Sequence, residues 1–355
     1  MSVLDAANAS REQRAPCWPA AYCYVMSPVS RRILLDTNLW SYLGDEDGGP
    51  GLTTALRDRG CEIVLAPSVL LEVLRSPHAE SRRRIVETMI ASKGKRLASE
   101  AELCAAQFVA VVKKLRPEWI RAMADTAKVD TYHKYWTKRV WRVASRDPDH
   151  LHKQIAGLDS TESHLLTVQR QNRESVLNEK FNFEIDDLWA EPSIDWQKHD
   201  SESYMEGWDG SRVPAWRIEL CDYYWQFMTT RGSIGQTERD WVGAYVDLRR
   251  ATSDRANFTK MWIDEIDAAE VPRDWIRWAV RWVQSTMKIT DGNPRDEQHS
   301  AYLVDADLCL SADRRFVGAL QAIRRRAPVE FADLRLVKVD RSVSIVENIV
   351  AALDR

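Results

Sequence analysis

Three carboxylates occupy positions from which they could line a binding crevice. Asp36 and Asp313 each follow a short apolar run and precede a helix signal, and Glu72 lies in a strongly apolar helical stretch. A carboxylate at the carboxyl end of a parallel strand sits where α/β folds place their ligand sites. Each strand-end aspartate also has a purely structural interpretation, because aspartate is a common helix N-cap. Glu72 either reaches toward water or points into a site, and the three acids in combination favour a site.

The elements that would carry these residues follow a strand-to-helix pattern. Apolar runs predict strands at 32–36 and 62–66, and cap residues with helical spacing predict a helix directly after each one. Near the C-terminus, a helix at 296–304 is expected to lead into strands at 307–313 and 334–339. This alternation predicts an α/β fold with a parallel sheet flanked by helices.

Between these two parts, residues 80–290 lose strand character and become helical. Apolar residues at helical spacing predict helices at 101–114, 119–129, 132–146 and 274–289. A chain of 355 residues also exceeds the roughly 250 to 300 at which a single core usually stops growing. We therefore expect the sheet domain to be interrupted by a mainly α-helical inserted domain.

Composition limits the class of protein. The chain is 45% hydrophobic and 29% charged, with a formal net charge of -3, which excludes disordered, collagen-like and coiled-coil classes. No stretch approaches the roughly 18 consecutive apolar residues of a membrane helix. Residues 1–30 lack a basic start followed by a long apolar run, so we expect a flexible extension rather than a secretory signal, and a cytoplasmic protein. Six scattered cysteines without a CxxC pair predict neither a zinc site nor a disulfide framework.

Several enzyme classes lack their motifs in this chain. There is no GxGxxG dinucleotide-binding fingerprint, no P-loop and no GxSxG nucleophile elbow. A haloacid-dehalogenase-like phosphatase needs a second aspartate two residues after the first, where this chain has Asn38. Dinucleotide, nucleotide-triphosphate and serine-hydrolase chemistry are therefore not expected.

Four stretches together resemble the four ordered acidic motifs of the PIN-domain nucleases. They are LLDTNLW at 34–40, PSVLLEVL at 67–74, DEQHSAY at 296–302 and LSADRRF at 310–316. The resemblance covers 31–85 and 285–355, which would form one discontinuous PIN-like domain around a helical insertion at 86–284. The length of that insertion departs from a compact PIN domain. Gating of the cleft, substrate contact and partner binding all stay open as its role.

The resemblance implies a metal-dependent endonuclease, most often one that acts on RNA. The acids of the four motifs are Asp36, Glu72, Asp296 and Asp313. They would hold one or two Mg²⁺ or Mn²⁺ ions, which prefer oxygen ligands. A metal can lower the pKa of a bound water that attacks phosphorus, so no side-chain nucleophile is required. Asn38 and Ser311 would orient the acids through hydrogen bonds.

The third acid is open to competition. Asp291, Asp305 and Asp307 lie close to Asp296 in the sequence. Asp296 is preferred because it opens the helix that continues through His299, whereas Asp307 begins the following strand. The family resemblance alone does not choose among them.

Three further residues have two interpretations each. His299 is either a substrate contact or a packed or surface histidine. Arg314 and Arg315 follow the last acid, where they either contact substrate phosphate or lie on a solvated helix turn.

Partners follow from the resemblance only. RNA is the expected substrate, a homodimer is a family-level expectation, and an antitoxin or another regulatory protein would fit a toxin or a defence nuclease. The rival hypothesis is a catalytically inactive PIN-like module that binds RNA or protein through the helical part.

The helical part has two compositional features. Thirteen of the 15 tryptophans lie between Trp119 and Trp282, either as stacking platforms for bases or as a large aromatic core. Residues 81–146 contain 16 Lys and Arg against 6 Asp and Glu, while 179–209 contain 10 acidic residues against two lysines. The basic segment either follows a phosphate backbone or faces the acidic block.

Overall fold

The sheet consists of five parallel strands in the order β3-β2-β1-β4-β5. The strands are β1 (Arg31–Leu35), β2 (Cys61–Leu65), β3 (Lys95–Arg96), β4 (Leu308–Ser311) and β5 (Asp333–Leu336). The computed structural model describes residues 30–156, 167, 174, 205–209, 213–230, 232, 235–286 and 293–354. The predicted α/β fold with a parallel sheet flanked by helices is confirmed.

The two strands that precede the predicted site residues are neighbours at the centre of the sheet. β1 lies between β2 and β4, and Ile33 pairs with Ile63 on one side and Leu308 on the other. Both faces of the central strands are covered, which explains why β1 and β4 are apolar runs rather than alternating sequences. Because all five strands are parallel, their carboxyl ends meet at one edge, and Asp36 follows β1 at that edge.

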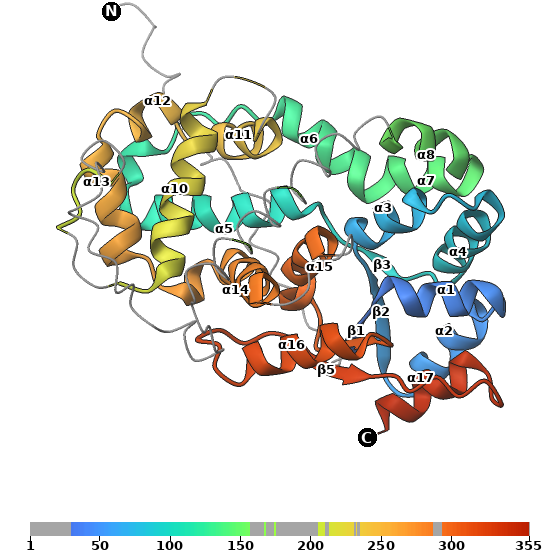
Figure 1. Ribbon diagram of the computed structural model, residues 1–355. Coiled ribbons are helices and arrows are strands. Elements are labelled where there is room, and N and C mark those ends of the chain that lie inside the picture. The colour runs from blue at the N-terminus through green and yellow to red at the C-terminus, as the bar shows by residue number, and fades with distance from the viewer. Residues whose placement is uncertain are drawn as a thin grey trace, which may run out of the picture.

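Helices cover both sides of the sheet. Figure 1 shows α1, α2, α4 and α17 on one side and α14, α15 and α16 on the other. The helices of the sheet region are α1 (Thr37–Asp45), α2 (Gly49–Arg57), α3 (Pro67–Arg75), α4 (Ala79–Ala91), α15 (Asn293–Ser300), α16 (Arg314–Arg324) and α17 (Ile345–Leu353). Each predicted strand-to-helix junction is present, so the sheet presents several helix N-termini at its carboxyl edge.

The remaining elements are helical, and helices dominate the described chain from residue 215 to α15. They are α5 (Glu100–Leu115), α6 (Ala127–Lys134), α7 (Val140–Arg146), α8 (Pro148–Ala156), α10 (Ala215–Thr229), α11 (Gln236–Gly243), α12 (Leu248–Ala251), α13 (Arg255–Lys260) and α14 (Pro272–Thr286). A π-helical turn, Tyr135–Arg139, joins α6 to α7, so the two run on as one helical stretch. Within the described ranges, no helix combines the length and the apolar composition needed to cross a membrane.

Two expectations for the helical part need correction. β3 is a strand inside the region expected to lack strands, and it pairs with β2. The helix predicted at 119–129 is also wrong: a 3-10 turn ends at Trp119, Ile120 forms an isolated antiparallel bridge with Val246, and helix resumes at α6. The amide of Arg121 donates to the carbonyl of Tyr245 at 2.8 Å. Backbone pairing with a distant segment therefore replaces the local helical hydrogen bonds.

Most of the tryptophans in the helical part form a core. Trp141, Trp262, Trp275 and Trp278 are among the largest fully buried side chains, and the Trp275 and Trp278 ring centroids lie 6.2 Å apart. The core of the described residues is continuous from the sheet into the helical part. The aromatic-core interpretation is therefore supported for these residues, while Trp189 lies outside the described residues, as does most of the acidic stretch 179–209.

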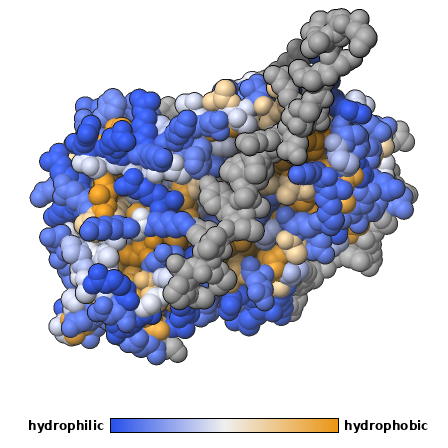
Figure 2. Space-filling model, turned by 180° about the vertical axis from the view of Figure 1, so that it is seen from behind, coloured by the Kyte–Doolittle hydropathy of each residue, from blue (hydrophilic) through white to orange (hydrophobic). Residues whose placement is uncertain are grey.

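The surface is largely polar. Figure 2, which views the molecule from behind, shows a mostly hydrophilic face with apolar residues gathered toward its middle. Among the described residues, the exposed large hydrophobic side chains are Met123 and Val343.

The central strand provides a test of this architecture. Ile33 is fully buried between β2 and β4, so Ile33→Ala should lower the free energy of unfolding by about 2–5 kcal/mol through lost burial and the cavity left behind. Val343→Ala is the matched control at an exposed site and should change it by less than about 0.5 kcal/mol. Urea unfolding followed by circular dichroism measures both. Equal effects of the two substitutions would contradict the assigned register of β1.

Candidate metal centre at the carboxyl edge of the sheet

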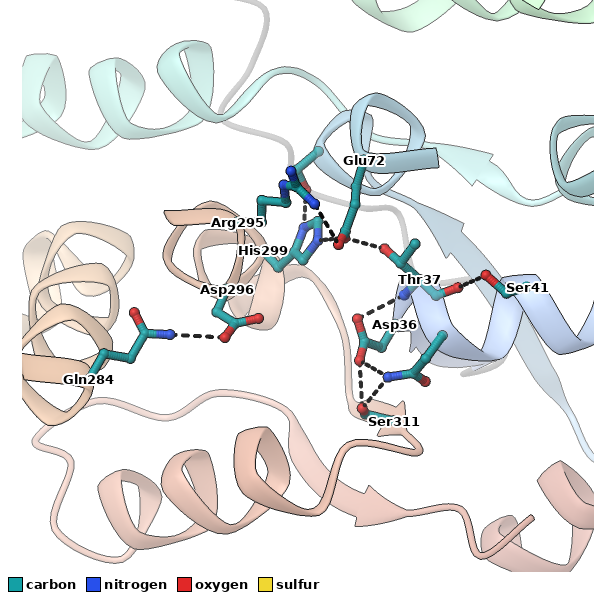
Figure 3. A network of polar contacts seen from close by, with 11 residues as sticks. Asp36, Thr37, Ser41, Glu72, Gln284, Arg295, Asp296, His299 and Ser311 are labelled. Carbon is teal, nitrogen blue, oxygen red and sulfur yellow. Dashed lines mark hydrogen bonds and ion pairs between the residues drawn. The ribbon is translucent and has the colours of Figure 1, made fainter. Parts of the chain in front are cut away.

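Asp36 is fixed at the junction of β1 and α1 by hydrogen bonds from three groups. Its Oδ1 accepts from the Thr37 amide at 2.7 Å, which makes Asp36 the N-cap of α1. Its Oδ2 accepts from Asn38 Nδ2 and from Ser311 Oγ, each at 2.5 Å (Figure 3). The hydrogen bonds expected from Asn38 and Ser311 to an acid of the site are therefore present. Together they leave the Asp36 carboxylate a single orientation.

The same two side chains fasten the segment that follows β4. The Ala312 amide donates to Asn38 Oδ1 at 3.0 Å, and the Asp313 amide donates to Ser311 Oγ at 2.9 Å. The Asp36 amide in turn donates to the Leu310 carbonyl at 3.0 Å. The first and last predicted motifs thus form one hydrogen-bonded unit across the β1–β4 pair.

Glu72 enters the site from α3, where it is surrounded by cationic and hydroxyl partners. Its Oε2 accepts from Thr37 Oγ1 at 2.5 Å and lies 2.7 Å from His299 Nε2, and its Oε1 is 3.7 Å from Arg295. Burial alone would raise the pKa of Glu72. The hydrogen bond and charge of His299, the Thr37 hydroxyl and Arg295 outweigh it and lower the pKa to about 2. Glu72 is therefore an anion under all ordinary conditions.

His299 was not expected at the centre of this site. It is buried on α15, with Nδ1 2.7 Å from Ser68 Oγ and Nε2 facing Glu72. Burial lowers the pKa of His299, but the hydrogen bond to Glu72 and the charges of Glu72, Asp36 and Asp296 more than reverse this, so the pKa is raised. A surface position is excluded, and a substrate contact stays untested. The available signal was its place three residues after Asp296, on the same helical face.

A potential metal-binding group is formed by Asp36, Glu72 and His299. One ligand atom from each of the three lies within 4.8 Å of the other two. No other group of this kind is found among the residues that the structure describes. Asp296 and Asp313 are not members of this group, so the metal-binding role expected for these two acids stays a prediction.

Asp296 nevertheless lies beside the cluster. Figure 3 shows its carboxylate facing Asp36 below His299, and its Oδ2 accepts from Gln284 Nε2 at 2.9 Å. Burial is the largest effect on the pKa of Asp296 and raises it. The charge of His299 lowers this pKa, but repulsion from Asp36 and two other acids adds to the effect of burial, so the pKa is raised to about 7. Asp36 has the same tendency, since burial is the largest of the effects that raise its pKa. Two of the acids thus resist ionisation in the absence of a cation.

Two competitors for the third acid are engaged elsewhere. Asp305 forms a two-pronged ion pair with Arg273, at 2.5 and 2.9 Å. Asp307 accepts from both the amide and the guanidinium of Arg32, at 2.7 to 3.2 Å. Asp291 lies outside the described residues.

Asp313 lies at the rim of the site rather than inside it. It is exposed and caps α16, with Oδ1 accepting from the amides of Arg315 at 2.7 Å and Phe316 at 3.1 Å. The side chains of Arg314 and Arg315 are also exposed. The helix-cap and solvated-turn interpretations therefore account for what is observed at these three positions, and the metal-binding and phosphate-binding roles stay predictions.

The pKa of Asp296 predicts a pH-dependent stability of the metal-free protein. Its pKa rises from 3.8 to about 7 on folding, so the folded state favours the neutral acid. That stability is present below pH 3.8 and is lost as the pH rises toward 7. Asp296→Asn, which stays neutral and keeps an acceptor for Gln284, should raise the free energy of unfolding at pH 8 by on the order of 2–4 kcal/mol.

The measurement is urea unfolding in EDTA at pH 8 and at pH 4. At pH 4 the gain from Asp296→Asn should be much smaller. The control is Asp354→Asn, at a carboxylate on the surface that pairs with Arg59. A gain of equal size at both pH values would show that Asp296 does not share its charge environment with the other acids.

In comparisons with known proteins, no family model, no curated protein and no solved structure matches this chain. The resemblance to PIN-domain nucleases therefore stays a prediction from four sequence motifs.

Proposed function

We propose that this protein is a metal-dependent endonuclease that hydrolyses RNA phosphodiester bonds at the carboxyl edge of its sheet. The observation that carries the proposal is the convergence of Asp36, Glu72 and His299, with one ligand atom of each lying within 4.8 Å of the others. These residues come from three separate segments, and two of them are the acids of the first two motifs shared with PIN-domain nucleases. Two partly buried carboxylates at one strand edge lose hydration and repel each other, which is unfavourable unless a cation or another partner compensates.

The donor chemistry fits Mg²⁺ or Mn²⁺. Carboxylate oxygens suit both ions, and Mn²⁺ also tolerates an imidazole nitrogen. A second argument comes from charge: the pKa of Asp36 is raised and that of Asp296 is raised to about 7. A divalent cation would reverse both shifts by favouring the ionised form. The negative charge of Asp36 and Asp296 is therefore only partly compensated, and a bound hard cation would stabilise their ionised forms.

The residues of the site would have two roles, cation binding and positioning of the cation ligands. Asp36 and Glu72 would bind the cation, with Asp296 as an additional ligand on the facing helix. Asn38 and Ser311 hold the Asp36 carboxylate in one orientation, and His299 holds Glu72. The bound cation would activate water for attack on phosphorus and stabilise charge on the scissile phosphate. No side-chain nucleophile is needed.

One observation favours the alternative of an inactive RNA-binding or protein-binding module. Glu72 is already neutralised by His299 and Arg295, so less of its charge remains for a metal. We favour the enzyme because no ion pair to Asp36 or Asp296 is found among the described residues, and burial outweighs the attraction of His299 so that the pKa of each is raised. A toxin or defence role, an antitoxin or other regulatory partner, a homodimer and a cytoplasmic location stay predictions.

Cleavage of single-stranded RNA in the presence of Mn²⁺ tests the function directly. The purified wild type should release fragments, and Asp36→Asn should release none above background. Ser311→Ala should lower the rate about 10- to 100-fold, as expected for loss of a group that orients a metal ligand. Asp354→Asn, the surface control, should cleave like the wild type. Sequencing the fragment ends gives the specificity, and equal cleavage by Asp36→Asn would assign the activity to another site.

Metal binding can be measured without any substrate. Mg²⁺ or Mn²⁺ should raise the melting temperature near neutral pH, since a ligand at about 100 times its Kd stabilises the folded state by about 2.7 kcal/mol. Differential scanning fluorimetry with and without each ion measures the shift, which should disappear in Asp36→Asn. Absence of a shift with either ion in the wild type would support the inactive module.

A further inference from the structure

Five cationic side chains lie along one exposed side of the helical stretch that runs from α6 to α7. We name this set the basic ridge: Lys134, Lys138, Arg139, Arg142 and Arg146. All five are exposed, and within the part of the chain that the structure describes none of them forms an ion pair. Four of them recur at every fourth residue, and the sequence from 131 to 146 contains no acidic residue.

The opposite side of the same stretch is buried and fixes the ridge in place. Val140, Trp141 and Ala144 are at most 1% exposed. The Arg96 guanidinium, on β3 at the carboxyl edge of the sheet, lies 5.4 Å from the Trp141 ring. The cations therefore lie on the face of the helical stretch that points away from the core.

The ridge is connected to the helix that carries Glu72. α8 follows α7 directly and packs against α3, and His152 of α8 is hydrogen-bonded through Nδ1 to the Leu74 carbonyl at 2.8 Å. Arg82 of α4 also pairs with Asp149 of α8 at 2.5 Å. A strand held on the ridge would thus be held at a fixed position relative to the metal centre.

We propose that the basic ridge binds the phosphate backbone of a single-stranded nucleic acid. From Lys134 to Arg146 the helix rises roughly 18 Å, at about 1.5 Å per residue. At the compact spacing of about 3.4 Å per phosphate in a duplex strand, that length covers at most about five phosphates. The row of exposed cations complements a polyanion of regular charge spacing.

Two aromatic residues favour a single strand over a duplex. Tyr135 and Trp136 are partly exposed on the same helical stretch, with ring centroids 5.2 Å apart. Unpaired bases stack on such rings, whereas the bases of a duplex are already stacked on one another. These two residues and two of the ridge cations belong to the π-helical turn, a conformation that often marks functional sites.

This inference rests on the proposed function, because it names the surface that would hold the substrate strand, but its test does not require cleavage. Full-length protein in EDTA is titrated into a fluorescently labelled single-stranded RNA 20-mer, and Kd is measured by anisotropy at several salt concentrations. In the variant Lys138→Gln/Arg142→Gln, binding should weaken. The slope of log Kd against log salt should fall by about 1.4, from about 0.7 per phosphate contact on a single strand.

The matched control is Arg249→Gln/Arg250→Gln. These residues are exposed on α12, at the far end of the helical part from α7 (Figure 1). The control removes the same two charges and should leave the slope unchanged. Circular dichroism checks that both variants are folded. A slope that is unchanged in the ridge variant, or that falls equally in both, overturns the ridge.

Titrations with other nucleic acids test which ligand the ridge prefers. Single-stranded DNA of the same sequence tells whether the ridge binds any single strand or RNA in particular, and duplex RNA should compete more weakly than either. If the acidic stretch 179–209 covers the ridge instead, the ridge variant and the control will bind RNA equally, which rejects the proposal. Mn²⁺-dependent cleavage with an unchanged slope would retain the nuclease and reject the ridge. A reduced slope without cleavage would retain the ridge and reject the nuclease.

Discussion

Gathering carboxylates at one buried strand edge is the constraint on which the site depends. Ionised acids repel one another and lose hydration, so each must gain hydrogen bonds or a cation. Asp36 gains three hydrogen bonds, two from the first residues of α1 and one from Ser311. Glu72 gains His299 and Arg295. Asp296 gains only an amide from Gln284 among the interactions shown in Figure 3, and its pKa rises accordingly. Under the proposed function, a bound cation would relieve the repulsion that remains among these acids.

The helical part takes part in the site because it shares the core and two connections with the sheet. α14 supplies Gln284 to Asp296 and Arg273 to Asp305, and so orients the helix α15 that carries His299. On the other flank, α8 packs on α3 beneath Glu72. A continuous core transmits displacement rather than absorbing it. The helical part therefore contributes residues that position the site, rather than only being attached to the sheet.

The sequence was sufficient for features that depend on local chemistry. A short apolar run followed by a polar cap predicts a buried parallel strand and the helix after it, because burial of both faces and the orphan amides of the helix impose those residue types. The cap interpretation of Asp36 and Asp313 was available in this way, whereas Asn38 and Ser311 were expected as partners of an acid only through the family resemblance. The helix that carries Glu72 was found for the same reason, since apolar spacing is a property of the element itself.

Only the tertiary structure decided which side chains meet. Asp305 and Asp307 are as acidic as Asp296, but their arginine partners lie 32 and 275 positions away, a distance that no local pattern encodes. The expected helix after Trp119 was lost because its backbone bonds to a segment more than 100 residues later. His299 joined Glu72 across 227 positions. Sequence sets what each segment can form alone, whereas partner choice follows from the packing of segments that become neighbours only after folding.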